Sequence, residues 1–454
     1  MKNKYFWVGL LFVFNMSMNA QYGVLDHTLD PGVGADDVIQ AMAVQPDHKI
    51  IIGGDFLNYG GLSKKRLTSL NGDGTLDTSF NVGSGANKLI TSVTLQPDGK
   101  IIVTGEFTIF NNTSKKRIVR LNADGSIDQT FNPGLGANET VETCLLQPDG
   151  KIVISGSFTA YNWAPRNGIA RLNSNGSLDT TFSAGDEPLV AADIKLLPNG
   201  NYLVNGVDRI VRLLPDGNID MLFHSSVTDY PIQATCVQAD GKIIVGGYFT
   251  MYGNTPVQRF IRLEENGVID ETFNNGVGVD YGVLTITEQP DQQILISGIF
   301  SKYNGVPIEK IARLHPDGTL DESFNPALGP NNIVLHHMMQ PDGRILIAGD
   351  FTEYNGFERN KIARINAFSQ LSVNHNTINT TISVYPNPAD NQLSISFPEN
   401  QTALSVKIFD LTGKVVTSVK DGMSTIDVSN LSKGVYMLSA VTETGTYNTR
   451  FVKQ

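Results

Sequence analysis

The stretch Val93-Thr94-Leu95-Gln96-Pro97-Asp98-Gly99-Lys100-Ile101-Ile102-Val103 decides the fold, because related copies of it recur along most of the chain. The tetrapeptide at its centre has seven versions, which begin at residues 45, 96, 147, 197, 238, 289 and 340. Successive versions lie 51, 51, 50, 41, 51 and 51 residues apart. A regular period of this size indicates a repeat architecture.

Each repeat predicts four short antiparallel strands. Asp98-Gly99 and Asp124-Gly125 each lie between β-branched runs, which is the strongest short-range hairpin signal. Ile101-Ile102-Val103 is apolar without alternation, as expected for a strand that is buried on both faces. Four strands in about 50 residues are typical of one β-propeller blade, whereas a β-helix coil is shorter.

The two ends of the repeat region indicate a closed ring. The last repeat stops at Ala363-Arg364-Ile365-Asn366 and lacks its fourth strand. Leu25-Asp26-His27-Thr28-Leu29-Asp30 matches a fourth strand, Leu76-Asp77-Thr78-Ser79-Phe80-Asn81, but no repeat precedes it. Pairing of these two ends would leave no sheet edge open. We therefore predict an all-β fold, a seven-bladed propeller closed by the N-terminal strand.

The repeat motifs resemble the delta-60 repeat β-propeller family. The shared patterns are L-D-x-T-F-N-P-G-x-G-A-N, Q-P-D-G-K-I-I, G-x-F-T-x-Y-N-G and R-I-x-R-L-N, and they cover about residues 24–366. The fourth unit departs from them, because Gly206-Val207-Asp208-Arg209 joins its second and third strands with about ten fewer residues. The resemblance implies a propeller and supplies no catalytic residues.

A second module follows a polar linker at residues 367–380. Leu393-Ser394-Ile395-Ser396-Phe397 alternates strictly, and turns at close spacing predict a small C-terminal β-sandwich over residues 381–454. Its motifs Y-P-N-P, I-F-D-L-T-G-K and L-S-K-G-V-Y resemble the C-terminal sorting domain of type IX secretion. The resemblance implies a bacterium of the Bacteroidota type, and export through the periplasm and outer membrane to the cell surface or beyond. The secretion machinery would then be a partner; the alternative is an accessory sandwich for adhesion.

The N-terminus predicts a secretory signal peptide at residues 1–20, followed by the propeller at residues 21–366. Lys2 and Lys4 precede the apolar run Tyr5–Phe14, and Ala20-Gln21 offers a cleavage site. The run is too short to span about 30 Å of hydrocarbon. We expect no transmembrane segment elsewhere.

Composition excludes several function classes. The 454 residues carry a net charge of −11, so no basic footprint for nucleic acid is present. Cys144 and Cys236 fall in repeats that are not neighbours, which predicts buried thiols without a bridge. No zinc, phosphate or nucleophile-elbow motif occurs, so we expect no cofactor and no metal.

Two recurring polar sets have a structural explanation and a functional one. Arginines recur on the third strand and aspartates on the fourth, and we expect them to pair with one another rather than to form an anion-binding ring. The aspartates are Asp77, Asp128, Asp179, Asp220, Asp270 and Asp321; the arginines are Arg120, Arg171, Arg212, Arg262, Arg313 and Arg364. Turns such as Asn71-Gly72-Asp73-Gly74 resemble calcium loops, although a simple Asp-Gly turn suits them better.

The longer connections share one face of the predicted propeller, where binding residues concentrate. One aromatic residue recurs there in six units, either to bind a ligand or to pack the loop: Tyr59, Phe110, Tyr161, Tyr252, Tyr303 and Tyr354. The same face carries Asp36-Asp37, Asn138-Glu139, Asp186-Glu187 and Asp280-Tyr281.

We expect a non-catalytic binding or scaffold module for an unknown protein or glycan ligand, and not an enzyme. The alternative is a secreted hydrolase or lyase that acts on polysaccharide through loop-face carboxylates; an adhesin differs from the first only in its partner. An enzyme should place two non-repeated carboxylates about 5–10 Å apart at the channel mouth, at least one of them perturbed. A scaffold should show only repeat-symmetric polar residues there, or an exposed aromatic surface.

Overall fold

The computed structural model describes residues 23–185, 189–206, 208–274, 276–367, 383–397, 405–409, 415–420, 425–441 and 446–454. The chain divides into two units, residues 1–370 and 371–454. The predicted signal peptide lies outside the described residues, and so does the predicted linker except for Ala367.

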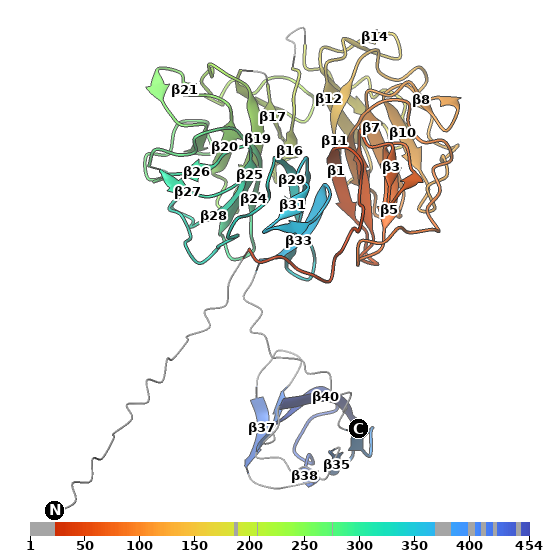
Figure 1. Cartoon of the computed structure of the whole chain (residues 1–454), viewed down its shortest axis with the longest axis vertical. Coiled ribbons are helices and arrows are strands. Elements are labelled where there is room, and N and C mark those ends of the chain that lie inside the picture. The colour runs from red at the N-terminus through yellow and green to blue at the C-terminus, as the bar shows by residue number, and fades with distance from the viewer. Residues whose placement is uncertain are drawn as a thin grey trace, which may run out of the picture. The chain divides into compact units, whose positions relative to one another are not determined.

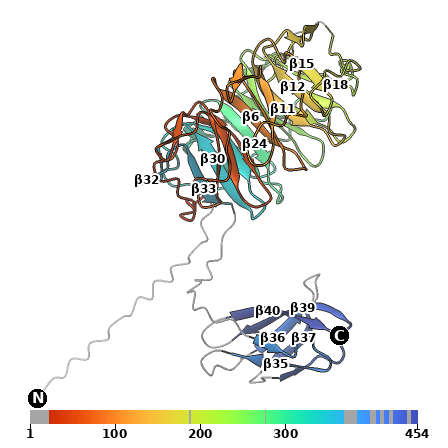
Figure 2. The ribbon, with the colours of Figure 1, turned by 90° about the vertical axis from the view of Figure 1, so that its right-hand side faces the viewer.

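The first unit is a β-propeller in which each repeat forms one three-stranded antiparallel sheet (Figure 1, Figure 2). We number the sheets one to seven in chain order. They comprise β1 (Ile39–Val44), β2 (Ile50–Gly54) and β5 (Leu67–Leu70); β6 (Ile90–Leu95), β7 (Ile101–Gly105) and β10 (Ile118–Leu121); β11 (Val141–Leu146), β12 (Ile152–Gly156) and β15 (Ile169–Leu172); β16 (Ile194–Leu196), β17 (Tyr202–Asn205) and β18 (Ile210–Leu213); β19 (Ile232–Val237), β20 (Ile243–Gly247) and β23 (Phe260–Leu263); β24 (Val283–Glu288), β25 (Ile294–Gly298) and β28 (Ile311–Leu314); and β29 (Val334–Met339), β30 (Arg344–Gly349) and β33 (Ile362–Asn366).

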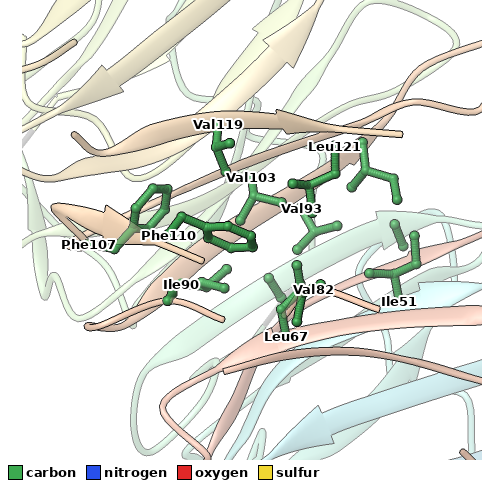
Figure 3. Packing of buried hydrophobic residues seen from close by; sticks show 14 of the residues in the cluster. Ile51, Leu67, Val82, Ile90, Val93, Val103, Phe107, Phe110, Val119 and Leu121 are labelled. Atoms are coloured by element: carbon green, nitrogen blue, oxygen red, sulfur yellow. The ribbon is translucent and has the colours of Figure 1, made fainter. Parts of the chain in front are cut away.

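Neighbouring sheets pack through apolar side chains. In the cluster of Figure 3, Ile51 and Leu67 come from sheet one, whereas Val93, Val103 and Val119 come from sheet two. All five are buried. Burial of each such side chain contributes about 1.5–3 kcal/mol. Both faces of each middle strand are buried where the sheets pack, which explains why these strands are apolar without alternation.

The fourth strand of each repeat is shorter than predicted. In sheet one it is a single antiparallel bridge between Leu70 and Leu76, and the Asp77 amide then donates to the Ser69 carbonyl at 2.9 Å. The chain next crosses to the following sheet, where the Asn81 amide donates to the Asp124 carbonyl at 2.7 Å. The strand ends early because its residues are needed to connect two sheets.

A two-residue hairpin extends the connection between the second and third strands in six repeats. The hairpins are β3 (Asn58–Tyr59) with β4 (Leu62–Ser63), β8 (Ile109–Phe110) with β9 (Thr113–Ser114), β13 (Ala160–Tyr161) with β14 (Ala164–Pro165), β21 (Met251–Tyr252) with β22 (Thr255–Pro256), β26 (Lys302–Tyr303) with β27 (Val306–Pro307), and β31 (Glu353–Tyr354) with β32 (Phe357–Glu358). Sheet four has only residues 206–209 between β17 and β18, as its shorter sequence predicts.

The recurring arginines pair with the recurring aspartates, as predicted. Arg262 Nε donates to Asp270 Oδ2 at 2.7 Å, and Arg262 Nη1 donates to the Pro316 carbonyl of the next sheet at 2.6 Å. Equivalent pairs are Arg120–Asp128, Arg171–Asp179, Arg212–Asp220 and Arg313–Asp321. In sheet one, where Ser69 replaces the arginine, Lys49 Nζ lies 3.1 Å from Asp77 Oδ2. In the six sheets that carry the arginine, its Nη1 also donates to a backbone carbonyl of the following sheet and so joins the two sheets.

The N-terminal segment contacts the last sheet. The Gly23 amide donates to the Asn366 carbonyl at 2.8 Å, and the Asp26 amide donates to the Arg364 carbonyl at 2.7 Å. Arg364 continues the arginine series, because its Nε donates to Asp26 Oδ2 at 2.6 Å and its Nη1 to the Gly72 carbonyl of sheet one at 2.7 Å.

The second unit is a β-sandwich of two sheets. One contains β34 (Ser383–Tyr385), β35 (Gln392–Ser396) and β38 (Thr425–Asp427); the other contains β37 (Val415–Lys420), β36 (Ser405–Phe409), β39 (Gly434–Val441) and β40 (Thr446–Lys453). Leu393 and Ile426 of the first sheet share a buried cluster with Val406, Leu438 and Phe451 of the second. This core explains the strict alternation of β35.

Candidate functional site

The six recurring aromatic residues are not a ligand surface, which corrects the binding interpretation. Their exposed fractions are at most 3%. The Tyr161 hydroxyl donates to the Gly176 carbonyl at 3.0 Å, and the Tyr252 hydroxyl donates to the Gly267 carbonyl at 2.9 Å. Tyr59, Tyr303 and Tyr354 make equivalent bonds, and Phe110 fills the same place without a hydroxyl. The five tyrosine hydroxyls each bond a hairpin to a backbone carbonyl, and all six rings fill the same buried place, so these residues maintain the repeat.

The polar residues of the loop face that recur are also structural. Asp280 Oδ1 accepts the Ser301 and Lys302 amides at 2.8 and 2.9 Å. Asp36 and Asn138 accept the equivalent hairpin amides in their own repeats. The Asp186-Glu187 pair lies outside the described residues.

The Asp-Gly turns use their carboxylates internally. Asp73 Oδ1 accepts hydrogen bonds from Thr75 N at 3.0 Å and from Thr75 Oγ1 at 2.7 Å, and these bonds hold the Asp73 pKa below its usual value. Asp124 and Asp317 have the same arrangement. Over the described part of the chain, no group of three His, Cys, Asp or Glu residues could hold a metal ion. The geometry supports the turn interpretation.

A central cavity of about 320 Å³ is lined by residues at, or just before, the beginning of the first strand of all seven sheets. Several of these strands, including β1, β11, β16, β24 and β29, lie toward the middle of the propeller in Figure 1. Of the seven first strands, all but that of sheet four carry a β-bulge at this point. In β1, Ile39 pairs with Gly54 and Ala41 with Gly53, so Gln40 has no partner. Bulges of this kind redirect side chains at functional places.

The cavity wall does not follow the repeat. Its first position in successive sheets holds Gln40, Thr91, Glu142, Ala192, Gln233, Leu284 and Leu335, and its second holds Ala41, Ser92, Thr143, Asp193, Ala234, Thr285 and His336. The strand residues that follow are apolar in most sheets. The repeated sheets therefore provide one backbone geometry, while the side chains of the wall differ from sheet to sheet.

An ion pair lies within the wall. Lys195 Nζ is 3.0 Å from Asp193 Oδ2, and this carboxylate raises the pKa of Lys195. The amide and hydroxyl of Thr235 both donate to Asp193 Oδ2 at 3.4 Å. The two charges therefore hold each other in place.

Two further titratable groups line the cavity. Burial, together with the nearby Lys195 ammonium, lowers the pKa of His336 to about 4, so the imidazole is neutral at pH 7. Its Nδ1 is shielded from solvent and has no hydrogen-bond partner among the described residues. Burial, together with the Glu106 carboxylate, raises the pKa of Glu142. The unpaired His336 Nδ1 and the Glu142 carboxyl, with its raised pKa, are groups to which a polar ligand could hydrogen-bond.

The serine–histidine pair near this region is inaccessible. Ser297 Oγ lies 2.7 Å from His337 Nδ1, but both residues are buried, and burial lowers the pKa of His337 to about 3. Cys144 and Cys236 are free, as predicted, but both residues are only partly buried, which corrects the prediction of fully buried thiols. Burial raises the pKa of Cys144 to about 12, so its thiol stays protonated.

Sequence reasoning missed Glu142, Asp193 and Lys195. All three stand at wall positions where the other repeats carry other residues, so a position-by-position comparison of the seven repeats could have found them. Two non-repeated carboxylates, one with a raised pKa, meet part of the enzyme criterion. Tyr230 and Tyr281, at the same end of the sheets, are exposed, as expected of the aromatic surface of a scaffold.

Two known family models match the chain, one in each of its two units. The model of the DUF5122 β-propeller, a domain of unknown function, matches residues 45–80, 96–131, 147–182, 238–273, 289–324 and 340–367. The model of the secretion system C-terminal sorting domain matches residues 383–454. The chain carries DUF5122 β-propeller repeats and a C-terminal sorting domain. The DUF5122 matches pass over the shortened fourth repeat, where the sequence also departs from the delta-60 pattern.

The sorting domain indicates export through type IX secretion to the cell surface or outside the cell. Within the described residues, no helix has the length and apolar character needed to cross a membrane. The C-terminal unit is thus the sorting domain that its motifs predicted. Its presence makes the secretion machinery a partner of the chain.

Several solved structures are similar to the chain at low sequence identity. The extracellular domain of a hybrid two-component system from B. thetaiotaomicron is 11% identical with a TM-score of 0.50; the match covers 96% of this chain and 57% of that one. PorZ, a surface component of the type IX secretion system of Porphyromonas gingivalis, is 14% identical with a TM-score of 0.45, over 93% and 60%. An inactive virginiamycin B lyase variant from Staphylococcus aureus is 16% identical with a TM-score of 0.49, over 75% and 98%. No curated protein matches the chain.

Proposed function

We propose that the protein is an exported β-propeller that binds a polar ligand in its central cavity without transforming it. The observation that carries this proposal is the cavity wall, where non-repeated polar groups stand on a repeated frame. A residue that recurs in every sheet serves the architecture. Glu142, Asp193, Lys195 and His336 do not recur, so the frame does not need them.

The proposed architecture is a ring of seven blades closed by the N-terminal segment. Leu25 bridges to Ile365, and Arg364 reaches both Asp26 and Gly72. The cavity takes lining residues from all seven sheets, which supports the same ring. A closed ring leaves no sheet edge unpaired and gives the ligand site a rigid wall.

The state of the charged groups favours binding over catalysis. Asp193 accepts hydrogen bonds from Thr235 and pairs with Lys195 at 3.0 Å, so its carboxylate is already engaged within the wall. The Ser297–His337 pair has the spacing of a nucleophile and its base, but it is buried. These features suit a site that recognises a ligand.

A hydrolase or lyase acting on polysaccharide remains a second candidate because of Glu142. Burial raises the pKa of Glu142, and a carboxyl that keeps its proton to higher pH can serve as a general acid. Asp193 in the same cavity would then act as the second carboxylate. This candidate predicts turnover that Glu142→Gln abolishes.

The two candidates are separated by one set of measurements. The purified protein is screened against glycan and protein arrays, and hits are titrated by calorimetry with the wild type, Asp193→Asn and Lys88→Ala. We expect at least tenfold weaker binding for Asp193→Asn, because loss of its charge leaves Lys195 unpaired. Lys88→Ala, outside the cavity wall, should leave affinity unchanged. Product release from a polysaccharide panel, abolished by Glu142→Gln, would overturn the binding proposal.

A further inference from the structure

Three tyrosines stand at the end of sheets five and six where their first strands begin. Tyr230 and Tyr281 lie two residues before β19 and β24, and Tyr248 follows β20 directly. Tyr230 is 58% exposed and Tyr281 is 53% exposed. We propose that Tyr248 and Tyr281, here called the tyrosine platform, bind carbohydrate beside the central cavity. The inference rests on the proposed function only in that this end of the propeller faces the ligand.

Comparison of the repeats shows that the fold does not require these tyrosines. The position of Tyr230 and Tyr281 is held in other repeats by Asp37, Lys88, Glu139 and Asn332. The position of Tyr248 is held by Asp55, Glu106, Ser157, Ile299 and Asp350. The same backbone therefore accepts small, charged and aliphatic side chains. Large aromatic groups that are exposed and not needed for packing mark an interaction surface.

The ring of Tyr248 lies in a space that the surrounding residues leave open for it. Tyr248 and Tyr281 meet edge to face, with ring centres 6.2 Å apart and an interplanar angle of 85°. A Cβ atom on Gly282 would lie 2.6 Å from Cε1 of Tyr248, so the ring of Tyr248 occupies the space that a side chain would fill. Other repeats carry Val38, Leu89, Thr140, Pro231 and Ile333 at that position. Glycine and tyrosine therefore occur together where the ring needs room.

The Arg259 guanidinium contacts the ring of Tyr281. The guanidinium carbon of Arg259 lies 6.0 Å from the centre of the Tyr281 ring, and Arg259 Nη1 also donates to the Val279 carbonyl at 3.4 Å. These contacts limit the motion of Tyr281 while about half of its surface stays open. A ring that is already oriented loses less entropy when a ligand stacks on it.

The surrounding charges favour an uncharged sugar chain. Both oxygens of Asp280 accept hydrogen bonds from Ser301, and both oxygens of Asp229 accept from Thr250, so neither carboxylate needs a ligand. What the platform offers is apolar ring surface edged by phenolic hydroxyl groups. A pyranose presents an apolar C–H face with hydroxyls around its rim, which matches that pattern. The net charge of −11 opposes binding of an anionic polymer.

The test uses affinity electrophoresis of the purified protein through gels containing soluble β-1,3-glucan, xyloglucan or galactomannan. We expect at least one of them to retard the wild type, and Tyr281→Ala and Tyr248→Ala each to weaken binding at least tenfold. Gly282→Val should weaken it as well, because the new side chain displaces the Tyr248 ring. Lys88→Ala, the same position in sheet two, should match the wild type. Circular dichroism spectra that match the wild type will show that the variants are folded.

The outcomes separate this inference from the proposed function. Loss of binding in the tyrosine variants with full binding in Asp193→Asn supports the platform and overturns the cavity assignment. Loss in Asp193→Asn with full binding in Tyr281→Ala and Tyr248→Ala overturns the platform. No retardation of the wild type by any of the three polysaccharides, or capture of a proline-rich peptide by the same tyrosines instead, also overturns it.

Discussion

At the scale of single residues, the buried arginine of the third strand shows how one side chain fixes two sheets. Arg262 bonds to Asp270 within its own repeat and to the Pro316 carbonyl of the next one, and its guanidinium lies 4.6 Å from the centre of the Phe273 ring. A planar group with five donors can serve a carboxylate, a carbonyl and an aromatic face together, whereas an ammonium cannot. The residue type follows from this threefold role.

Arg262→Ala should lower the free energy of unfolding by about 3 kcal/mol, because it leaves Asp270 buried without its main partner. Lys242→Ala removes a cation 2.8 Å from the same Asp270 Oδ2, but that side chain is 24% exposed, so its loss should cost less. Urea denaturation followed by circular dichroism measures both. Equal losses would show that solvent screens the two contacts alike.

At the scale of elements, the hairpins reveal a strained position in sheet three. Trp163 has φ +68° and is 83% exposed, whereas Gly61, Gly305 and Gly356 occupy the equivalent place with φ between 76° and 78°. A left-handed backbone costs a residue with a Cβ about 1–2 kcal/mol, and glycine avoids that cost. The exposed indole gains little from packing in return.

Trp163→Gly should therefore raise the stability of the propeller by about 0.5–1 kcal/mol, after the greater chain entropy of glycine is counted. The reciprocal change, Gly305→Trp, should lower stability by a similar amount, because nothing lies within 4 Å of its Cβ position and only backbone strain is added. Thermal unfolding of the two variants tests the pair. A destabilised Trp163→Gly would reveal packing by the indole.

At the scale of the whole molecule, Asp26 is the charged residue that joins the N-terminal segment to the last sheet of the propeller. Burial acts to raise its pKa, but hydrogen bonds from Thr28, Arg364 and Arg344 outweigh burial and bring the pKa from 3.8 to about 2. Because the folded value lies below the ordinary one, the stabilisation is complete above about pH 4. It is lost as the pH falls through 2.

Asp26→Asn should cost about 2 kcal/mol at pH 7, since it removes a carboxylate bonded to Arg364 at 2.6 Å and Arg344 at 2.7 Å. The stability difference between the wild type and the variant should shrink as the pH falls from 4 to 2. Denaturation at a series of pH values measures it, with Asp47→Asn, an exposed aspartate, as the control. A difference that is independent of pH would exclude Asp26 as the titrating group.

The candidate site was less predictable than the fold. Recurring residues such as Tyr161 attract attention in a sequence, yet recurrence reflects a shared packing task, and the structure buries that ring against the Gly176 carbonyl. Glu142 and Asp193 looked unremarkable because they lie about 50 residues apart in the chain. The propeller brings them to one wall, which local patterns do not reveal.

The sequence alone determined the first three strands of each sheet, their order, the Asp-Gly turns and the Arg–Asp pairing, because each depends on contacts within one repeat or between adjacent ones. Its motifs also identified the sorting domain. Only the tertiary structure decided which side chains face ligand. That choice depends on bulges at positions such as Gln40, and on which rings neighbouring sheets cover. Tyr161 and Tyr281 have the same chemistry in the sequence. Tyr161 is buried, with its hydroxyl bonded to the Gly176 carbonyl, whereas Tyr281 is 53% exposed.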